Sequence, residues 1–452
     1  MKQPSKLIAG LVAVCAAVWI IAAIHPLDRQ AWVLENILLV VFAGGLALTY
    51  RRLQFSNTSS VSLAAFVILH TIGAHYTYEK MPLGIWARDF FHLSRNHYDR
   101  FAHGAFGFLL VFPIRELLLR FSGIRRGAWS FALPVAIVLA VSGCFEIIES
   151  IVAEMVAPGK GVQWLGGQGD EWDAQNDVVS ALVGSLLMMG VVAMLKCTEA
   201  RPHLHSLPLS PAGRDARAYA SPARTGSEGR GVGLGEANAE RNTFPHSNAR
   251  DIGKHFLPIA VACYVAFWIA LAIHPLDRSD WLLENLLIFI SVIVLAFSYR
   301  KFRFSNLSYA LIVVFLAFHT IGAHYTYAKV PAGFWMQDWL HLNRNHYDRV
   351  IHFSFGFLLL YPMRELLVRS VHAGKQWGTW LAVAALAALS SFFEIIEAVV
   401  AQIVRPDLGA AYLGTQGDIW DAQKDMGAAF AGAVTSALAI VLLKRASAEA
   451  VG

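Results

Sequence analysis

Residues 70–78 read HTIGAHYTY, and the same nine letters return at residues 319–327. Each copy is followed by the hexapeptide RNHYDR, at 95–100 and at 344–349. Both copies end an apolar run of about twenty residues, which is the length that an α-helix needs to cross the hydrocarbon core of a membrane. Ionisable groups are costly in such a place, so the histidines and acids of these stretches are candidates for function.

The duplication extends over nearly the whole chain. His25 recurs as His274, Glu35 as Glu284 and Asp170 as Asp418, and roughly half of the aligned positions are identical. We therefore predict a six-helix membrane repeat at 1–198 and a second at 253–452. Between them, residues 199–252 are rich in Ala, Gly, Arg, Pro and Ser, a composition that predicts a flexible linker without its own core.

The composition points to a membrane protein and excludes several other classes. The chain has 452 residues, of which 56% are hydrophobic and 15% charged, whereas soluble proteins have about 25% charged residues. A net charge of +5 without a clustered basic face argues against nucleic-acid binding. None of the four cysteines has a cysteine counterpart in the other copy, so neither a disulfide framework nor a thiolate metal site is expected.

The apolar runs predict an all-α polytopic fold with about twelve transmembrane helices in two homologous six-helix bundles. The first run, near 7–24, is not a signal peptide in this interpretation, because the same segment recurs inside the chain. A short interfacial helix or ordered loop is expected at 84–97. The expected spans are 7–24, 33–50, 59–78, 101–120, 128–153 and 174–195, followed by 256–273, 282–299, 308–327, 350–369, 378–402 and 422–444.

The distribution of Lys and Arg predicts the orientation. Arg51 and Arg52, the turn at 115–126 and the linker arginines fall on one side of this scheme, as do the corresponding turns of the second copy. That side is expected to be cytoplasmic, together with both termini and the linker, so the chain would be a multi-pass protein of the bacterial inner membrane. Six is an even number, so the two bundles are expected to lie in parallel orientation.

The recurring ionisable residues gather at the opposite, outward side. All six histidines of the first copy recur in the second, and most of the acids recur as well. In an alternating bundle the helix ends that carry them meet, which predicts one outward-facing polar pocket per repeat. Asp99 and His103 are spaced i,i+4, and Glu146 and Glu149 are spaced i,i+3, so each pair shares one face of a helix.

Histidines and carboxylates that converge from several helices are how bundles build metal sites. The expected cofactor is a divalent metal, with Zn, Fe or Mn suited to this donor set. Glu149 or Asp177, and Glu397 or Asp425 in the second copy, are the expected general bases. The candidate metal ligands are His70, His75, Asp99, His103 and Glu146, and in the second copy His319, His324, Asp348, His352 and Glu394.

Some of the recurring residues also suit purely structural roles. His92 and His341 suit interfacial anchors, Asp173 suits a helix N-cap and Asp170 suits a loop carboxylate. A site without metal could also relay protons or bind a cation, as in a transporter or channel. A third interpretation is a non-catalytic factor for envelope stress or assembly.

Four motifs resemble the YjdF family of bacterial inner-membrane proteins: HTIGAHYTY, NHYDRxxH, FEIIE and GDxWDAQxD. The resemblance covers both copies and implies a multi-pass inner-membrane protein whose typical member is similar to one copy. A looser resemblance is to VanZ-like membrane proteins, on the order Asp99-x-x-x-His103, Glu146-x-x-Glu149 and Asp173-x-x-x-Asp177. It implies work in the cell envelope.

These observations lead to one functional expectation. Each repeat is expected to hold an outward-facing His/Asp/Glu site, and the site would serve a metal-assisted hydrolase or transferase that acts on an envelope or lipid-linked substrate. The alternative is a transporter or channel. The expected partners are the lipid bilayer and a substrate, with no nucleic acid.

Overall fold

The computed structural model describes residues 6–156, 168–199, 252–403 and 416–449, and within these every regular element is an α-helix. We call α1–α7 repeat 1 and α8–α15 repeat 2. Repeat 1 consists of α1 (Lys6–Ala22), α2 (Arg29–Leu53), α3 (Asn57–His75), α4 (Pro82–Phe91), α5 (Tyr98–Phe121), α6 (Trp129–Val156) and α7 (Asp173–Glu199). Repeat 2 consists of α8 (Ile252–Ala272), α9 (Arg278–Tyr299), α10 (Asn306–Tyr325), α11 (Pro331–Leu340), α12 (Tyr347–Arg369), α13 (Lys375–Ile403) and α15 (Asp421–Glu449).

The expected all-α polytopic fold is confirmed. Among the described residues, 11 helices are long and apolar enough to cross a membrane. The twelfth expected span is α1, an apolar helix of 17 residues. At 1.5 Å per residue its length is about 26 Å, a little short of the ~30 Å hydrocarbon core. The predicted linker lies almost wholly outside the described residues, so its boundaries stay a prediction.

The short helix α4 overlaps the stretch 84–97, where an interfacial helix or ordered loop is expected, and α11 is its counterpart in repeat 2. Each begins at a proline, which suits the first turn because proline lacks a backbone N–H there. Trp86, Phe90 and Phe91 are largely exposed on α4. Exposed aromatic side chains of this kind are typical of a helix that lies in a membrane interface.

Two recurring acids explain where helices begin. The Asp28 carboxylate accepts hydrogen bonds from the backbone N–H groups of Gln30 and Ala31, at 2.8 and 3.0 Å, and so caps the start of α2. Glu116 lies at the other end of the bundle, where its carboxylate accepts from the backbone N–H and the hydroxyl of Ser56 at the start of α3. These two acids hold helix ends, which is a structural use.

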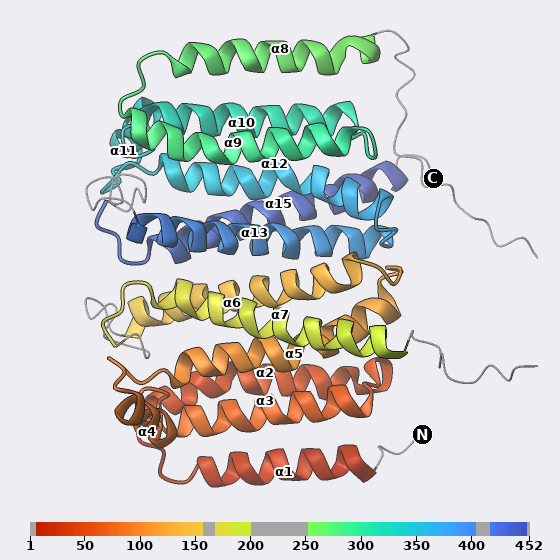
Figure 1. Ribbon diagram of the computed structural model, residues 1–452, viewed down its shortest axis with the longest axis vertical. Helices are drawn as coiled ribbons and strands as arrows, with labels where there is room; N and C mark the ends of the chain where they lie inside the picture. Colours follow the sequence, from red (N-terminus) through yellow and green to blue (C-terminus); the bar gives the residue numbers. More distant parts are fainter. Residues whose placement is uncertain (1–5, 157–167, 200–251, 404–415, 450–452) are drawn as a thin grey trace, which may run out of the picture.

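The helices run side by side, and the two repeats are stacked with α1 and α8 at the outer ends (Figure 1). Helices α4 and α11 lie at the same end of the molecule, so the two repeats have the predicted parallel orientation. Within repeat 1, α5 and α7 are in close contact, because a Cβ added at Gly107 would overlap the carbonyl of Ala181. Small residues of this kind let membrane helices approach closely, and here they bring the first turns of α5 and α7 together.

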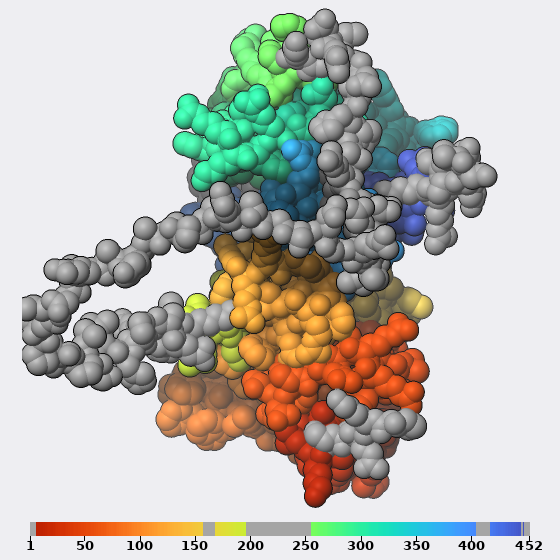
Figure 2. All heavy atoms as spheres, turned by 90° about the vertical axis from the view of Figure 1, so that its right-hand side faces the viewer, coloured from red at the N-terminus to blue at the C-terminus, as the bar shows by residue number. Residues whose placement is uncertain are grey.

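The repeats meet through α6 and α13. A Cβ at Gly143 of α6 would overlap the hydroxyl of Ser391 of α13, which occupies the corresponding position of repeat 2. Contact between equivalent positions places the pseudo-twofold axis at this helix pair, along the helix direction. Seen along the helices, amber residues of repeat 1 adjoin blue residues of repeat 2 at this level (Figure 2). A buried apolar cluster that contains Leu133, Leu360 and Leu386 joins the two halves.

Candidate functional site

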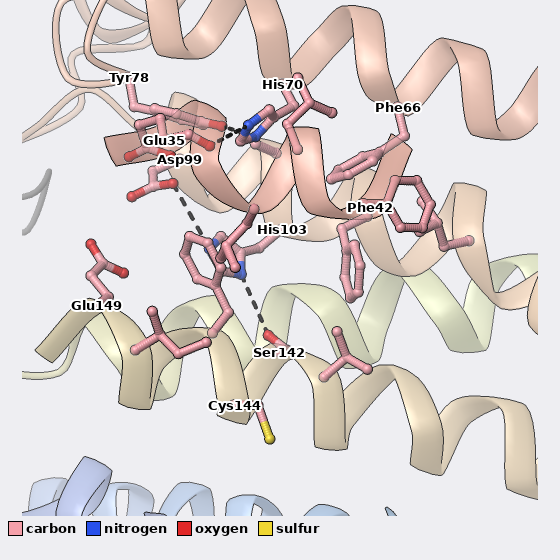
Figure 3. A pocket seen from close by; sticks show the side chains of 18 of the residues that line it. Glu35, Phe42, Phe66, His70, Tyr78, Asp99, His103, Ser142, Cys144 and Glu149 are labelled. Atoms are coloured by element: carbon pink, nitrogen blue, oxygen red, sulfur yellow. Dashed lines mark hydrogen bonds and ion pairs between the residues drawn. The ribbon is translucent and has the colours of Figure 1, made fainter. Parts of the chain in front are cut away.

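A cavity of about 600 Å³ lies inside repeat 1, among α2, α3, α5 and α6. Its two ends differ in chemistry (Figure 3). Glu35, Asp99 and Glu149 gather at one end, and the rings of Phe42 and Phe66 lie at the other, with His103 between them. The cavity therefore combines a polar end, near the first turn of α5, with an apolar body.

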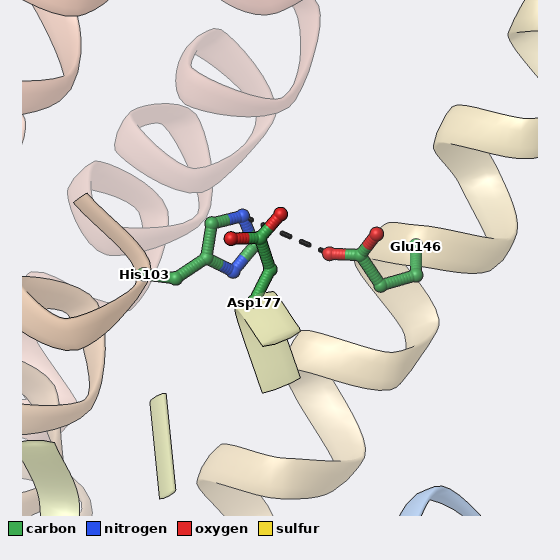
Figure 4. Close-up of side chains that lie close together, drawn as sticks. All are labelled: His103, Glu146 and Asp177. Carbon is green, nitrogen blue, oxygen red and sulfur yellow. Dashed lines mark ion pairs between the residues drawn. The ribbon is translucent and has the colours of Figure 1, made fainter. Parts of the chain in front are cut away.

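Three side chains from three helices meet beside this polar end (Figure 4). One potential ligand atom from each of His103, Glu146 and Asp177 lies within 4.8 Å of the others, and we call these residues the ligand group. The His103 Nε2 atom is 3.7 Å from Glu146 Oε1 and 3.9 Å from Asp99 Oδ1. Glu146 and Asp177 are 4% and 2% exposed, and each has one carboxylate oxygen without a hydrogen-bond partner.

A second group of possible ligands adjoins the first. Asp99, Asp173 and Asp177 also place one oxygen each within 4.8 Å of one another, so Asp177 belongs to both groups. The expected i,i+4 pair of Asp99 and His103 is present on the first turns of α5. Glu149 lines the cavity, whereas Glu146 points to the ligand group.

The carboxylates outnumber the cations around this end. Arg95 and Arg100 pair with Asp170 and Asp173, with 2.7 Å from Arg95 Nη1 to Asp173 Oδ1. Among the described residues, the remaining acids at this end form no ion pair with an arginine or lysine, and His103 faces two of them. The acids without an arginine or lysine partner are Glu35, Asp99, Glu146, Glu149 and Asp177. Buried like charges cannot all be ionised unless protons or a bound cation neutralise them.

His70 lies at the cavity but outside both ligand groups. Its Nε2–H donates to the backbone carbonyl of Glu35 at 3.2 Å, so Nδ1 carries the lone pair, and Nδ1 accepts from the Tyr78 hydroxyl at 2.5 Å. Burial, with the nearby charges of Glu35 and Asp99, raises the pKa of Tyr78 well above its ordinary value. The hydroxyl therefore stays protonated and holds the ring in this orientation.

His75 contacts the backbone instead of the cavity. Its Nδ1–H donates to the carbonyl of Ala22 at 2.8 Å, and its own carbonyl accepts from the N–H of Leu27 at 3.1 Å. His324 makes the matching bond to Leu271 at 2.7 Å. Both histidines thus tie the end of the first helix of their repeat to the third, away from the ligand groups.

Repeat 2 presents a related arrangement with different pairing. Its possible ligands are Asp348, His352 and Asp425. Glu394 lies 3.8 Å from His352 Nδ1, and Glu397 follows one turn later on α13. His319, like His70, bonds a backbone carbonyl through Nε2 and a tyrosine through Nδ1.

One ion pair distinguishes the two sites. Arg349 Nε lies 2.8 Å from Asp425 Oδ1, whereas no ion pair joins Arg100 to Asp177 among the described residues. The acid that corresponds to Asp177 is therefore neutralised by the protein itself in repeat 2.

Sequence reasoning underrated several residues that build the site. Glu35 and Tyr78 line the cavity, and both belong to recurring stretches, which is the signal that could have marked them. Asn96 was missed: its side chain donates to the carbonyls of Glu79 and Met81 and accepts from the Tyr98 N–H. It therefore holds the turn before α4 against the start of α5.

The surroundings of two residues in the loops, His97 and Asp418, shift their pKa values. Burial, together with Arg100 and Arg95, lowers the pKa of His97, so this histidine favours its neutral form. In repeat 2 burial alone would raise the pKa of Asp418, but hydrogen bonds from Lys424, the Trp420 N–H and Arg349 lower it. The rim of the site in repeat 2 thus includes an aspartate whose ionised form is favoured by the groups that bind it.

Residues 7–197 and again residues 256–446 match the profile of a family described as predicted membrane protein (DUF2238). The chain belongs to this family. The two matches confirm the tandem duplication, and each match covers one repeat of the DUF2238 type.

Inner membrane protein YjdF of Escherichia coli (strain K12) is 38% identical over 165 residues, which cover 36% of this chain and 78% of that relative. The relative therefore corresponds to about one repeat, and the resemblance to the YjdF family is confirmed. No solved structure matches the chain at a significant level. The resemblance to VanZ-like proteins rests on three spacings and stays a prediction, as does the cytoplasmic position of the termini.

Proposed function

We propose that repeat 1 carries the site of a metal-assisted hydrolase or transferase that acts on an envelope or lipid-linked substrate. The observation that carries this proposal is a set of five acids, two of them buried and three partly buried, that have no arginine or lysine ion-pair partner among the described residues and lie at the polar end of a largely apolar cavity. A divalent cation would neutralise the acids, and the apolar body of the cavity suits a hydrophobic substrate.

The ligand group supplies the donors for the metal. His103, Glu146 and Asp177 offer one nitrogen and two carboxylate oxygens, a set that suits Zn, Fe or Mn. Asp99 is the adjacent donor through the second group. A metal here would polarise a phosphoryl or carbonyl oxygen and lower the pKa of a bound water.

Glu149 is the proposed general base. It lines the cavity one turn from Glu146 on α6, so its carboxylate can reach a water or substrate proton beside the metal ligands. Asp177, the other expected base, fits better as a ligand because it belongs to both ligand groups. His70, locked by Tyr78 and the Glu35 carbonyl, would position the substrate at the cavity wall.

The alternative function is transport of a cation or of protons through the same acids. The excess of carboxylates supports it, because such a cluster binds cations and protons equally well. Against it, the buried residues Leu118, Ile124 and Leu133 fill the bundle near the other end of α5 and α6. Uptake into proteoliposomes that is abolished by Glu146→Gln with Glu394→Gln would decide for transport.

Elemental analysis by mass spectrometry of the detergent-purified full chain tests the proposal, after separate exposure to Zn, Mn and Fe. We expect about one equivalent of metal per occupied site, lost from His103→Ala with Asp177→Asn. His92→Ala, which removes an exposed histidine directly after α4, is the matched control and should retain the metal. Circular dichroism and gel filtration check that each variant is folded.

Turnover is measured on the same preparations with a panel of phosphate esters and carboxylic esters. Glu149→Gln should retain the metal and lose turnover by at least about 100-fold, the lower range for a general base. Wild-type protein that binds no metal under any of these conditions would contradict the proposal.

A further inference from the structure

We propose that the cavity of repeat 1 binds a lipid phosphate with a single long chain, its phosphate at the polar end and its chain among the apolar lining residues. This inference rests on the proposed function, because a phosphate needs the metal in order to lie beside the carboxylates. It adds the class of substrate and the route by which the substrate enters.

The cavity has the length that a long chain requires. Its lining on α5 extends from Asp99 to Ile114, which corresponds to about 22 Å at the rise of an α-helix. Beyond the polar end, the lining is made almost entirely of Leu, Ile, Val and Phe side chains. A small polar metabolite would leave this apolar surface uncovered, whereas an acyl or isoprenyl chain would cover it.

The cavity opens sideways, towards the region that lipid chains occupy. Leu38 of α2 is 36% exposed, and Val141 and Ile148 of α6 are 46% and 42% exposed, although all three line the cavity. Among the described residues, α2 contacts α3 more than any other helix and makes few contacts with α6, so the space between α2 and α6 is not closed by helix packing. A lipid can therefore enter from the bilayer without passing through water.

The size of the cavity favours one chain over two. A volume of about 600 Å³ lies within the range of about 300–1,000 Å³ that is typical of sites for one drug-sized ligand. The two chains of a diacyl phospholipid would need a second groove of similar length.

The charge of the polar end of the cavity determines which head group can bind there. The carboxylates alone would repel a phosphate, but a divalent cation held by the ligand group reverses the local charge and can accept phosphoryl oxygens. In the reaction, the oxygen of a water forms a bond to phosphorus and the bond from phosphorus to the chain oxygen breaks. Glu149 takes the proton of the water and gives it to the leaving alcohol, so the products are a lipid alcohol and inorganic phosphate.

Repeat 2 provides the matched control, because the same positions are filled there. Ile351 occupies the position of Ala102 and belongs to a buried cluster with Ile288, Phe315 and Tyr327. These three residues correspond to Leu39, Phe66 and Tyr78, all of which line the cavity in repeat 1. The fold therefore accepts an isoleucine at this position, and Ala102→Ile should narrow the cavity without unfolding repeat 1.

The test is photolabelling of the full chain in lipid nanodiscs with a long-chain alkyl phosphate that carries a diazirine near the end of its chain. Mass spectrometry maps the labelled residues in the presence of Mn²⁺ or Zn²⁺. We expect labels on α2, α5 and α6 of repeat 1, at least tenfold fewer in Ala102→Ile, and few on repeat 2. Cys144→Phe, which introduces the residue found at Phe392, is a second variant that fills the cavity.

Three outcomes would overturn the inference: equal labelling of both repeats, labelling that neither variant reduces, or stronger labelling by an alkylamine of the same chain length without metal. Metal binding and cleavage of soluble phosphate esters without lipid labelling would overturn the lipid substrate and leave the proposed function intact. Labelling of the cavity by the alkyl phosphate in protein that binds no metal would instead overturn the metal-assisted chemistry.

Discussion

Repeats 1 and 2 carry the same ionisable residues but surround them differently. In repeat 1, His70 and Glu35 line a cavity. In repeat 2 their counterparts His319 and Glu284 are 2% and 4% exposed, next to a packed cluster that contains Ile351. The two halves therefore share the polar residues and differ in the apolar residues beside them.

The acids of the two sites also differ in their ion-pair partners. Asp425 lies within ion-pair distance of Arg349 in repeat 2, whereas among the described residues no arginine pairs with Asp177 in repeat 1; one oxygen of each acid lacks a hydrogen bond. A duplicated site can thus change its capacity for a ligand through one packing residue and one ion pair, while every candidate ligand is kept. This difference makes each repeat the control for the other.

The largest expected effect comes from the arginine of repeat 2. Arg349→Gln leaves Asp425 without an arginine, although Arg344 still pairs with Asp418 and Asp421, and breaking a buried pair typically costs about 3–5 kcal/mol. Arg100→Gln should cost less, because among the described residues Arg100 forms no ion pair with Asp177, and Arg95 still pairs with Asp170 and Asp173. Thermal unfolding in detergent compares the two, and equal shifts of Tm would show that the sites are balanced alike.

Packing beside the site gives the next effect. Ile351→Ala should destabilise repeat 2 by about 2–4 kcal/mol, because it deletes buried methyl groups from a filled cluster. Ala102→Ile, the reciprocal change, should cost less than about 1.5 kcal/mol since it extends into an existing cavity. Melting temperatures of both variants measure this, and a larger loss for Ala102→Ile would contradict an open repeat 1.

The two repeats should also differ in their metal-binding free energy, by less than the stability effects above. We expect the tighter site in repeat 1, so Asp177→Asn should weaken it by at least about 10–100-fold, the loss seen when even an outer partner of a metal ligand is removed. Asp425→Asn should leave this tighter site unchanged, because Asp425 belongs to the group of possible ligands in repeat 2. Competition with a chelator measures both constants. Equal losses would mean that the repeats bind metal alike.

The smallest effect concerns Lys424, which stands where repeat 1 has Asn176. It pairs with Glu154 of repeat 1 at 3.0 Å, but both side chains are partly exposed, so Lys424→Asn should cost only about 0.2–1 kcal/mol.

The lowered pKa of Asp418 makes part of this effect dependent on pH. The stabilisation is present above the unfolded pKa of about 3.9 and is lost as the pH falls through the lower folded pKa. Melting temperatures between pH 6 and pH 3 should therefore fall less in Lys424→Asn than in the wild type. A parallel decline in the two proteins would rule out Lys424 as a cause of the lowered pKa.

Much of the fold was predictable because apolar length and internal repetition are local properties of a sequence. Eleven of the expected spans are helices long and apolar enough to cross a membrane, and the short helix α4 overlaps the expected stretch at 84–97. The site was predictable only in outline. His103, Glu146 and Asp177 do converge, whereas His75, with the same spacing signal as His70, bonds a backbone carbonyl. Which ring nitrogen meets which group depends on how the helices are rotated, and residue spacing does not specify that rotation.

The sequence by itself determined that the chain is a duplicated helical membrane protein. It also determined that the recurring histidines and acids occupy corresponding helix ends. Both conclusions follow because the length of an apolar run and the identity of a residue can be read directly from the sequence. Only the tertiary structure decided that a cavity lies beside Ala102 in repeat 1 and that the counterparts of its lining residues Leu39, Phe66 and Tyr78 pack into a buried cluster in repeat 2. That outcome depends on the space left between helices, where Ala102 and Ile351 meet residues far away in the chain. Side-chain packing of this kind depends on which helix surfaces are in contact in the folded protein, and the sequence does not show which surfaces these are.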